Sequence, residues 1–468
     1  MDWEALALLD WLALAEHELL LFAGCFFLIG AIDELAVDAV WVWLKVTGRA
    51  VTRTIDRAGE RGRPLSGGAA VLIPAWQEAE VIGATISHAL AAWPQQELTL
   101  YVGCYRNDRA TAEAVIAAAR GDSRLRLVLH DRDGPTTKAD CLNRLYRALG
   151  DDERRRGGEP YRMVLLHDAE DMVDPAALSV LDRALEDADF VQIPVRPEPQ
   201  AASRWIAGHY CEEFAEAHAK AMVVRDALSA GLPAAGVGCA FARPILARLA
   251  RGRPGNDGPF SVDSLTEDYE LGIRVKAAGG KARFLRVRGD DGQLVATRAC
   301  FPARLGPSVR QKTRWVHGIA FQGWDRLGWS PHPVELWMRM RDRRGPLTAI
   351  VLAAAYLLLA IAVVLWTAEW LGYGRHWLDD PVVELLVVVN FASFVWRAAM
   401  RFAFTSREYG PGEAIWAVAR IPVANIVAIL AGKRALFAYI GSLAGGAPQW
   451  DKTHHHAHPA AMAKETAA

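Results

Sequence analysis

The chain has 468 residues, of which 52% are hydrophobic and 17 are tryptophan, so it is long enough for two or three domains and apolar for a soluble protein. Its 53 basic and 54 acidic residues give a formal charge of -1, which gives no reason to expect a nucleic-acid partner. The six cysteines form no C-x-x-C pair, and this spacing argues against both a zinc site and a disulfide framework.

The first apolar stretch, residues 19–32, is too short to cross a bilayer alone. It reaches spanning length only if the helix continues through Asp33, Glu34 and Asp38. The stretch is also too long and too acidic for a cleaved signal peptide. We therefore expect residues 1–46 to form an N-terminal helix and transmembrane span.

Short apolar runs alternate with helical patterns between residues 67 and 300. The apolar runs predict strands at residues 69–74, 98–103, 125–129, 163–167 and 189–194, and the intervening patterns predict helices at residues 79–92, 109–119 and 138–149. Strands alternating with helices indicate an α/β fold with a mostly parallel sheet. The segment 151–158 is predicted to be a charged surface loop.

Polar residues follow each of the first four predicted strands, where ligands bind in sheets of this kind. In chain order they are Glu78, Asp108, Lys138 and the run Asp168-Ala169-Glu170-Asp171. A lysine and a carboxylate cluster at one sheet edge suit an anionic ligand with a divalent metal. The sequence contains neither G-x-G-x-x-G nor a Walker motif, so a Rossmann dinucleotide site or a P-loop has no support.

Two later motifs complete a set that suits metal-dependent sugar transfer. Thr266-Glu267-Asp268 offers an acid at a helix start, and Gln311-x-x-Arg314-Trp315 offers an amide, a guanidinium and an indole. Displacing a nucleoside diphosphate requires charge neutralised on the leaving group, and the acceptor hydroxyl requires one carboxylate as base. A single base opposite the leaving group predicts inversion. The alternatives are an ordinary helix N-cap at 266–268 and an ordinary loop at 168–171.

The C-terminal half begins with a short helical region at residues 326–346, which we expect at the membrane interface. Residues 347–368 are almost wholly apolar and residues 381–400 form a second apolar stretch, so residues 347–404 predict two transmembrane spans. A buried helix of a large soluble protein is the alternative for the first stretch.

Residues 412–440 predict an amphipathic helix lying at the interface. Only 12 uncharged residues separate Arg420 from Lys433, too few to span, although a fourth span is the main alternative. Basic residues cluster after the first span, before the second and at the end of the third, whereas the intervening loop is acidic apart from Arg375. This asymmetry predicts that residues 47–345 are cytoplasmic.

Six motifs in order make residues 67–325 resemble family-2 glycosyltransferases of the membrane-embedded, processive type, the relatives of cellulose, chitin and hyaluronan synthases. The motifs are Val71–Glu78, Lys138–Asn143, Asp168–Glu170, Gly236–Arg243, Thr266–Asp268 and Gln311–Trp315. Details at residues 105–108, 167–171 and 314–324 look closest to the bacterial NfrB-type subgroup, an inner-membrane glycan synthase group linked to phage adsorption. The resemblance implies a GT-A-type domain inserted between transmembrane helices.

The resemblance also implies a role for each motif residue. Glu78 and Asp108 would surround the base and ribose of the nucleotide, and Lys138 would lie near the diphosphate. Asp168 and Glu170 would hold the diphosphate and Mg²⁺ or Mn²⁺. Asp268 would be the catalytic base, and the acceptor and diphosphate would be bound by Gln311, Arg314 and Trp315. Asp171 is an alternative metal ligand to Glu170. The chain departs from the family where Cys104-Tyr105 replaces the usual adjacent aspartates.

Residues 446–468 resemble a gating loop, with Trp450 and Thr453 expected to insert over the nucleotide; metal binding by His454–His456 and His458 is the alternative. The resemblance implies transfer of a hexosamine from a UDP-sugar to a growing exported glycan at the bacterial inner membrane. Single transfer to a lipid carrier and a non-catalytic receptor or scaffold are the competing hypotheses. Expected partners are the glycan acceptor, the lipid bilayer and either an outer-membrane or regulatory partner or a second copy of the chain.

Overall fold

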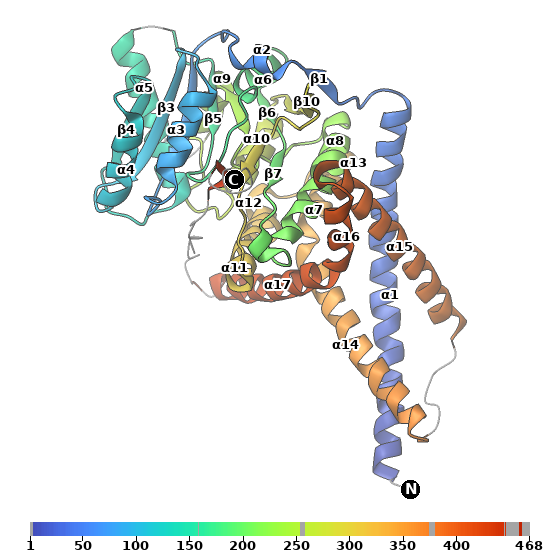
Figure 1. The fold of residues 1–468 in the computed structure, drawn as a ribbon. Coiled ribbons are helices and arrows are strands. Elements are labelled where there is room, and N and C mark those ends of the chain that lie inside the picture. Colours follow the sequence, from blue (N-terminus) through green and yellow to red (C-terminus); the bar gives the residue numbers. More distant parts are fainter. Residues whose placement is uncertain are drawn as a thin grey trace.

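The computed structural model describes residues 3–157, 159–252, 258–373, 380–443, 445 and 458–460. An α/β domain is inserted in the sequence between long apolar helices, and α1, α14 and α15 lie together on one side of it (Figure 1). The N-terminal helix is α1 (Trp3–Val46), and the later ones are α14 (Gly345–Trp370), α15 (Pro381–Tyr409) and α17 (Ile421–Leu443). The expected insertion of a mostly parallel α/β domain between apolar helices is therefore confirmed.

Seven strands form the main sheet in the order β4-β3-β2-β5-β8-β6-β9. They are β2 (Ala69–Pro74), β3 (Leu98–Tyr105), β4 (Leu125–His130), β5 (Met163–Leu166), β6 (Phe190–Gln192), β8 (Cys239–Ala242) and β9 (Ala282–Phe284). Only β8 runs antiparallel to its neighbours β5 and β6. Two small parallel sheets pair β1 (Arg53–Ile55) with β10 (Val287–Gly289) and β7 (Val195–Pro197) with β11 (Thr297–Ala299).

The remaining elements are helical. They are α2 (Arg57–Arg61), α3 (Ile82–Ala92), α4 (Arg109–Ala119), α5 (Lys138–Arg156), α6 (Ala177–Ala184), η1 (Ala201–Ser203), α7 (Gly208–Glu216), the π-helix η2 (Ala217–Ala221), α8 (Met222–Ala227), α9 (Arg243–Arg251), α10 (Glu267–Ala277), α11 (Leu305–Val316), the π-helix η3 (His317–Gln322), α12 (Gly323–Leu327), α13 (Pro333–Arg343) and α16 (Pro411–Ala419).

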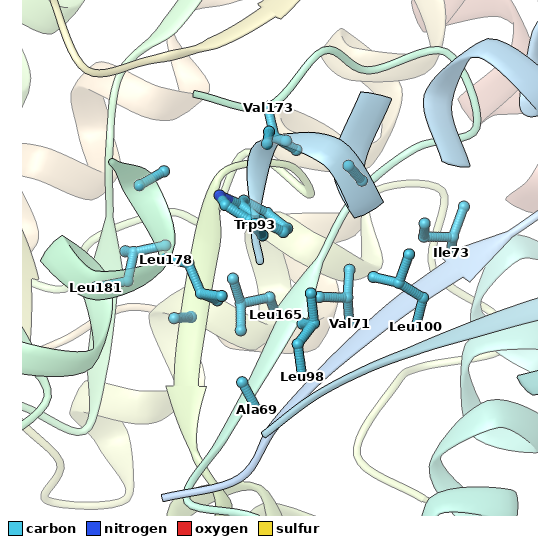
Figure 2. Packing of buried hydrophobic residues seen from close by; sticks show 14 of the residues in the cluster. Ala69, Val71, Ile73, Trp93, Leu98, Leu100, Leu165, Val173, Leu178 and Leu181 are labelled. Carbon is cyan, nitrogen blue, oxygen red and sulfur yellow. The ribbon is translucent and has the colours of Figure 1, made fainter. Parts of the chain in front are cut away.

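Strand β2 shows why this sequence forms a central strand. Successive side chains of a strand point to opposite faces, and Val71 and Ile73 enter one core whereas Ala70 and Leu72 enter the other. A strand buried on both faces needs a continuous apolar run, which the β2 sequence Ala-Ala-Val-Leu-Ile-Pro supplies. Figure 2 shows Val71 near Trp93 in the first core. The sheet is therefore rigid where the polar loops leave it.

The predicted loop at 151–158 is wrong over most of its length, because α5 continues to Arg156. The described part of the segment has no helix breaker before Gly157, which ends the helix in the left-handed conformation. Arg154, Arg155 and Arg156 lie in the last turn, where positive charge favours a helix.

Among the residues that the structure describes, four helices are long and apolar enough to cross a membrane: α14, α15, α17 and the part of α1 from Leu8 to Val46. Each of the three predicted spans lies within one of them. The predicted helix at 412–440 is divided at Arg420 into α16 and α17, since Pro422 has no N–H and suits only the first turn of a new helix. Figure 1 shows α17 running across the direction of α1. Its interfacial location stays a prediction, with the fourth span as alternative.

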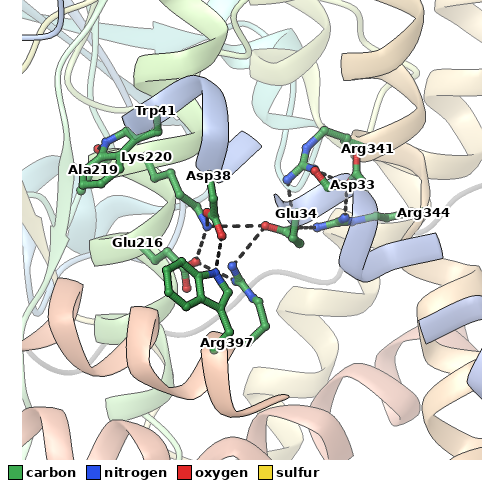
Figure 3. Close-up of polar contacts among 11 residues, drawn as sticks. Asp33, Glu34, Asp38, Trp41, Glu216, Ala219, Lys220, Arg341, Arg344 and Arg397 are labelled. Carbon is green, nitrogen blue, oxygen red and sulfur yellow. Dashed lines mark hydrogen bonds and ion pairs between the residues drawn. The ribbon is translucent and has the colours of Figure 1, made fainter. Parts of the chain in front are cut away.

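Three acidic residues in the second half of α1, Asp33, Glu34 and Asp38, pair with basic residues of other elements (Figure 3). The Asp38 carboxylate accepts a 2.6 Å hydrogen bond from Nζ of Lys220, and Lys220 also donates to Glu216 at 2.8 Å. Both Asp38 and Lys220 are buried. Burying a charge is tolerated only when it is paired, so this contact explains how a long apolar helix accommodates an aspartate.

Asp33 and Glu34 form the second half of this network. Arg344 donates to Asp33 at 2.7 Å and Arg341 donates to Glu34 at 2.9 Å. Arg397 of α15 lies 3.3 Å from Glu34. The network thus joins α1 to α13, α14 and α15 beside the α/β domain.

Candidate active site

An open cleft of about 850 Å³ lies at the edge of the sheet where β2 and β5 end. Residues from five of the six motifs line it: Glu78, Lys138, Asp168, Glu170, Asp268, Gln311, Arg314 and Trp315. They come from the loops after β2 and β5, from the first turns of α5 and α10, and from α11. The structure therefore brings together all but two of the predicted site residues.

The loop after β5 presents Asp168 and Glu170 to the cleft but turns Asp171 away from it. The carboxylate of Asp171 is buried, accepts a 2.8 Å hydrogen bond from the backbone N–H of Asp168, and lies 3.3 Å from Nδ1 of His167. Burial raises the pKa of Asp171. Asp171 thus shapes the loop, whereas Asp168 and Glu170 line the cleft.

Lys138 is the first residue of α5, where Thr137 caps the helix by accepting from the N–H of Asp140. Its Nζ lies 2.5 Å from Oδ1 of Asp168 and 3.9 Å from Oε1 of Glu267. Burial alone would lower the pKa of Lys138, but the surrounding carboxylates outweigh it and raise that pKa above its usual value. Lys138 is therefore a fixed cation in the cleft.

Asp268 lies in the first turn of α10, beside the more deeply buried Glu267. Oδ1 of Asp268 accepts a 2.7 Å hydrogen bond from the N–H of Tyr269. Burial raises the pKa of Asp268, and Lys138 partly opposes this shift. Burial and the neighbouring Asp268 raise the pKa of Glu267 to about 7. Glu267 was not assigned a role from the sequence, because an N-cap motif does not reveal which of its acids faces a cation.

Helix α11 presents Gln311, Arg314 and Trp315 to the cleft. These positions are three and four residues apart and so share one helix face. The Trp315 ring packs edge-on to Tyr210 and Phe301, with ring centres 6.2 and 6.4 Å apart. The indole is therefore held in place by an aromatic cluster. Arg314 adds a second positive charge to the cleft that Lys138 also lines.

An aromatic wall, formed by Trp76 and Tyr105, closes another side of the cleft. The two rings meet edge-on with centres 5.2 Å apart, and Tyr105 stacks on His130 at 5.0 Å. The sequence did not predict this wall, because it depends on the pairing of β2 with β3. The one sequence feature that could have indicated it is that an aromatic residue lies at or just after the end of each of these two strands.

Glu78 and Asp108 have different positions. Glu78 lines the cleft, and its backbone N–H donates to Thr111 at 3.0 Å. Asp108 does not line the cleft; it caps α4 by accepting from Thr111 and also accepts a 2.5 Å hydrogen bond from the N–H of Gln77. In this structure Asp108 orders the loop after β2.

The donor set fits a divalent cation shared with a substrate. The described residues contain no group of three or more His, Cys, Asp or Glu side chains arranged to hold a metal. Asp168 and Glu170 nevertheless both line the cleft, and Mg²⁺ in such sites commonly takes one or two carboxylates and completes its shell with substrate phosphates and water.

The remaining residues that the sequence predicted to be functional lie near the C-terminus. Trp450, Thr453 and His454–His456 lie outside the described residues. His458 is buried, with Nε2 3.3 Å from the carbonyl oxygen of Asp171.

Comparison with known proteins agrees with this architecture. The family described as "Glycosyltransferase like family 2" matches residues 67–318. The mannosyltransferase PcManGT from Pyrobaculum calidifontis, solved in complex with GDP-Man and Mn2+, shares the fold with a TM-score of 0.50 and 18% identity, over 92% of this chain and 99% of that one. The fold and the cleft define a GT-A-like glycosyltransferase domain with long apolar helices.

Two relatives extend the match over almost the whole chain. Bacteriophage adsorption protein B of Escherichia coli K12 is 31% identical over 490 residues, covering 97% of this chain and 64% of that protein. Bacteriophage N4 adsorption protein B of Escherichia coli O157:H7 matches to the same extent. This chain thus spans a little under two thirds of the length of these relatives. The chain belongs to glycosyltransferase family 2, which confirms the resemblance drawn from its motifs.

Proposed function

We propose that this chain is a metal-dependent, inverting glycosyltransferase of the bacterial inner membrane that transfers a hexosamine from a UDP-sugar to a growing exported glycan. One observation carries the proposal: the Lys138–Asp168 pair and Asp268 meet in one cleft, facing Arg314 and Trp315. This reaction requires a positive charge, a carboxylate that can bind a metal ion, a general base and a surface that binds the acceptor.

In the proposed reaction the UDP diphosphate binds beside Lys138 and Arg314. When bound, a divalent cation held by Asp168 and Glu170 would neutralise charge on the diphosphate. Lys138 and Arg314 stabilise the negative charge that develops as the bond from the anomeric carbon to the diphosphate breaks. The aromatic wall of Trp76 and Tyr105 offers a surface on which the uracil ring stacks.

Asp268 then acts as the base. It takes the proton of the acceptor hydroxyl while that oxygen forms the new bond to the anomeric carbon from the side opposite the departing diphosphate. The raised pKa of Asp268 brings its basicity nearer to neutral pH. A single displacement of this kind inverts the anomeric centre.

The membrane arrangement supports an acceptor that arrives from the bilayer side. Helix α17 contacts both α11, which carries Arg314 and Trp315, and α14. The cleft therefore lies close to the apolar helices, and an acceptor on Trp315 would have a short route to them. With the α/β domain in the cytoplasm, the cleft would meet the compartment that contains nucleotide sugars.

A panel of nucleotide sugars with Mg²⁺ or Mn²⁺, using chain purified in detergent, tests the proposal. We expect metal-dependent release of UDP from a UDP-hexosamine and a product of inverted configuration in an anomeric NMR time course. Long glycan products would support polymerisation, and lipid products extended by one sugar would favour the single-transfer hypothesis. A retained configuration would contradict inversion, and no release from any donor would favour a non-catalytic receptor.

A further inference from the structure

A second cavity, with about 990 Å³ of open space, lies between α5 and α9 and shares no lining residue with the active cleft. Four arginines line it: Arg144, Arg147 and Arg154 from α5 and Arg243 from α9. Two aspartates, Asp131 and Asp151, complete the charged lining. No residue of this cavity was assigned a function from the sequence.

Two of the arginines supply surplus positive charge. Arg154 pairs with Asp151 and Arg243 pairs with Glu153. Arg144 and Arg147 lie three residues apart on one side of α5, and neither forms an ion pair with another residue in the described ranges. Asp131 lies within electrostatic reach of both arginines, but one carboxylate does not neutralise two guanidinium groups, so positive charge remains for an anion.

The Arg243 guanidinium is held in a fixed orientation. Its Nε and Nη2 donate to the two oxygens of Glu153 at 3.0 and 2.8 Å, it hydrogen-bonds to the hydroxyl of Tyr146, and it lies over the Tyr146 ring at 4.6 Å. Only 15% of its side chain is exposed. A preorganised guanidinium loses little conformational entropy on binding a phosphate.

We infer that this cavity binds a soluble phosphorylated anion of nucleotide size. Arginine suits phosphate because its planar fork donates two parallel hydrogen bonds, and the enclosed part of the cavity, about 470 Å³, is within the range for small-ligand pockets. Figure 1 shows α5 and α9 at the end of the α/β domain away from α1, α14 and α15. This location favours a free metabolite over a lipid headgroup. The inference does not depend on the proposed transferase activity.

The cavity shares an element with the active cleft. Helix α5 begins at Lys138 in the cleft and carries Arg144, Arg147 and Arg154 at the cavity. On the same helix, Asn143 donates to the carbonyl of Phe260 at 2.9 Å and accepts from its N–H at 3.0 Å. An anion held by these arginines would therefore rest on the helix that places Lys138.

Isothermal titration with pyrophosphate tests the inference, using the full chain in detergent with EDTA to remove metals. The double variant Arg144→Glu/Arg147→Glu should bind at least tenfold more weakly than the parent. Arg155→Glu, an exposed change on the same helix, should bind as the parent does. Arg314→Glu, which reverses a charge in the active cleft, should keep this binding. Equal thermal midpoints of the parent and the double variant would show that folding is intact.

Three results would overturn the inference: no binding to the parent, equal affinity in the double variant, or binding that is lost in Arg314→Glu but kept in the double variant. The titration is then repeated in nanodiscs of phosphatidylcholine with and without phosphatidylglycerol. Equal affinities would support a soluble ligand. Weaker binding with phosphatidylglycerol would mean that lipid headgroups compete, and would overturn the assignment to a soluble anion.

Discussion

Gly236 lies directly against Asp268: a Cβ atom on Gly236 would stand 2.4 Å from Oδ2 of Asp268 and 3.3 Å from Nζ of Lys138. Gly236 also has φ of +76°, a left-handed conformation that favours glycine. The absence of a side chain at this position is therefore part of the active cleft, since it leaves room for the proposed base and the cation.

Gly236→Ala should reduce activity because its methyl group displaces the Asp268 carboxylate. A misplacement of about 1 Å can cost on the order of 100-fold in rate, so we expect a loss of that size in kcat for UDP release. Gly279→Ala is the matched control, because Gly279 has φ of +77° with no atom within 4 Å of its added Cβ. Equal activity losses in the two variants would mean that backbone strain alone explains the effect.

Glu267→Gln should change how stability depends on pH. The pKa of Glu267 is raised to about 7 from an ordinary 4.5, so the folded state binds this proton more tightly than the unfolded chain. The stability of the parent should therefore fall as pH rises from about 4.5 to 7, whereas the variant lacks this contribution. Between pH 5 and 8 the parent should lose roughly 1–3 kcal/mol more than the variant. Parallel stability curves from denaturant unfolding would contradict this assignment.

The three carboxylates after β5 should have two different roles. Asp168→Asn and Glu170→Gln should each raise the Mn²⁺ concentration needed for half-maximal activity by at least tenfold, because each removes a proposed ligand. Asp171→Asn should mainly lower the thermal midpoint, since it weakens the contacts to His167 and to the N–H of Asp168. A metal titration of all three variants checks this division; an Asp171→Asn profile like that of Asp168→Asn would place Asp171 among the ligands.

Lys220→Met should destabilise the attachment of α1 to the α/β domain. It leaves the buried Asp38 without its cation, a change that costs about 3–5 kcal/mol for buried ion pairs, whereas Glu216 keeps its ion pair with Arg397. Arg109→Met removes an ion pair from a side chain that is 89% exposed and should cost less than about 1 kcal/mol. Thermal midpoints in detergent compare the two, and equal shifts would show that the buried network contributes no more than a surface pair.

The sequence predicted the parts of the fold that depend on local patterns. The apolar run at 69–74 indicated a buried strand, and the structure has one there. The partners of Asp33 and Asp38 could not be predicted, because Arg341 and Lys220 are far away in the chain. The inward turn of Asp171 depends on a loop geometry that its spacing does not determine.

Purified chain with Mn²⁺ and a UDP-hexosamine provides the most direct test of the proposed transfer, when UDP release is compared between the parent and Asp268→Asn. The amide keeps the size of the side chain but accepts no proton, so the variant should release UDP at least 1000-fold more slowly, on the order expected for loss of a general base, while binding UDP with unchanged affinity. Equal rates in the parent and the variant would contradict the role of Asp268 as the base.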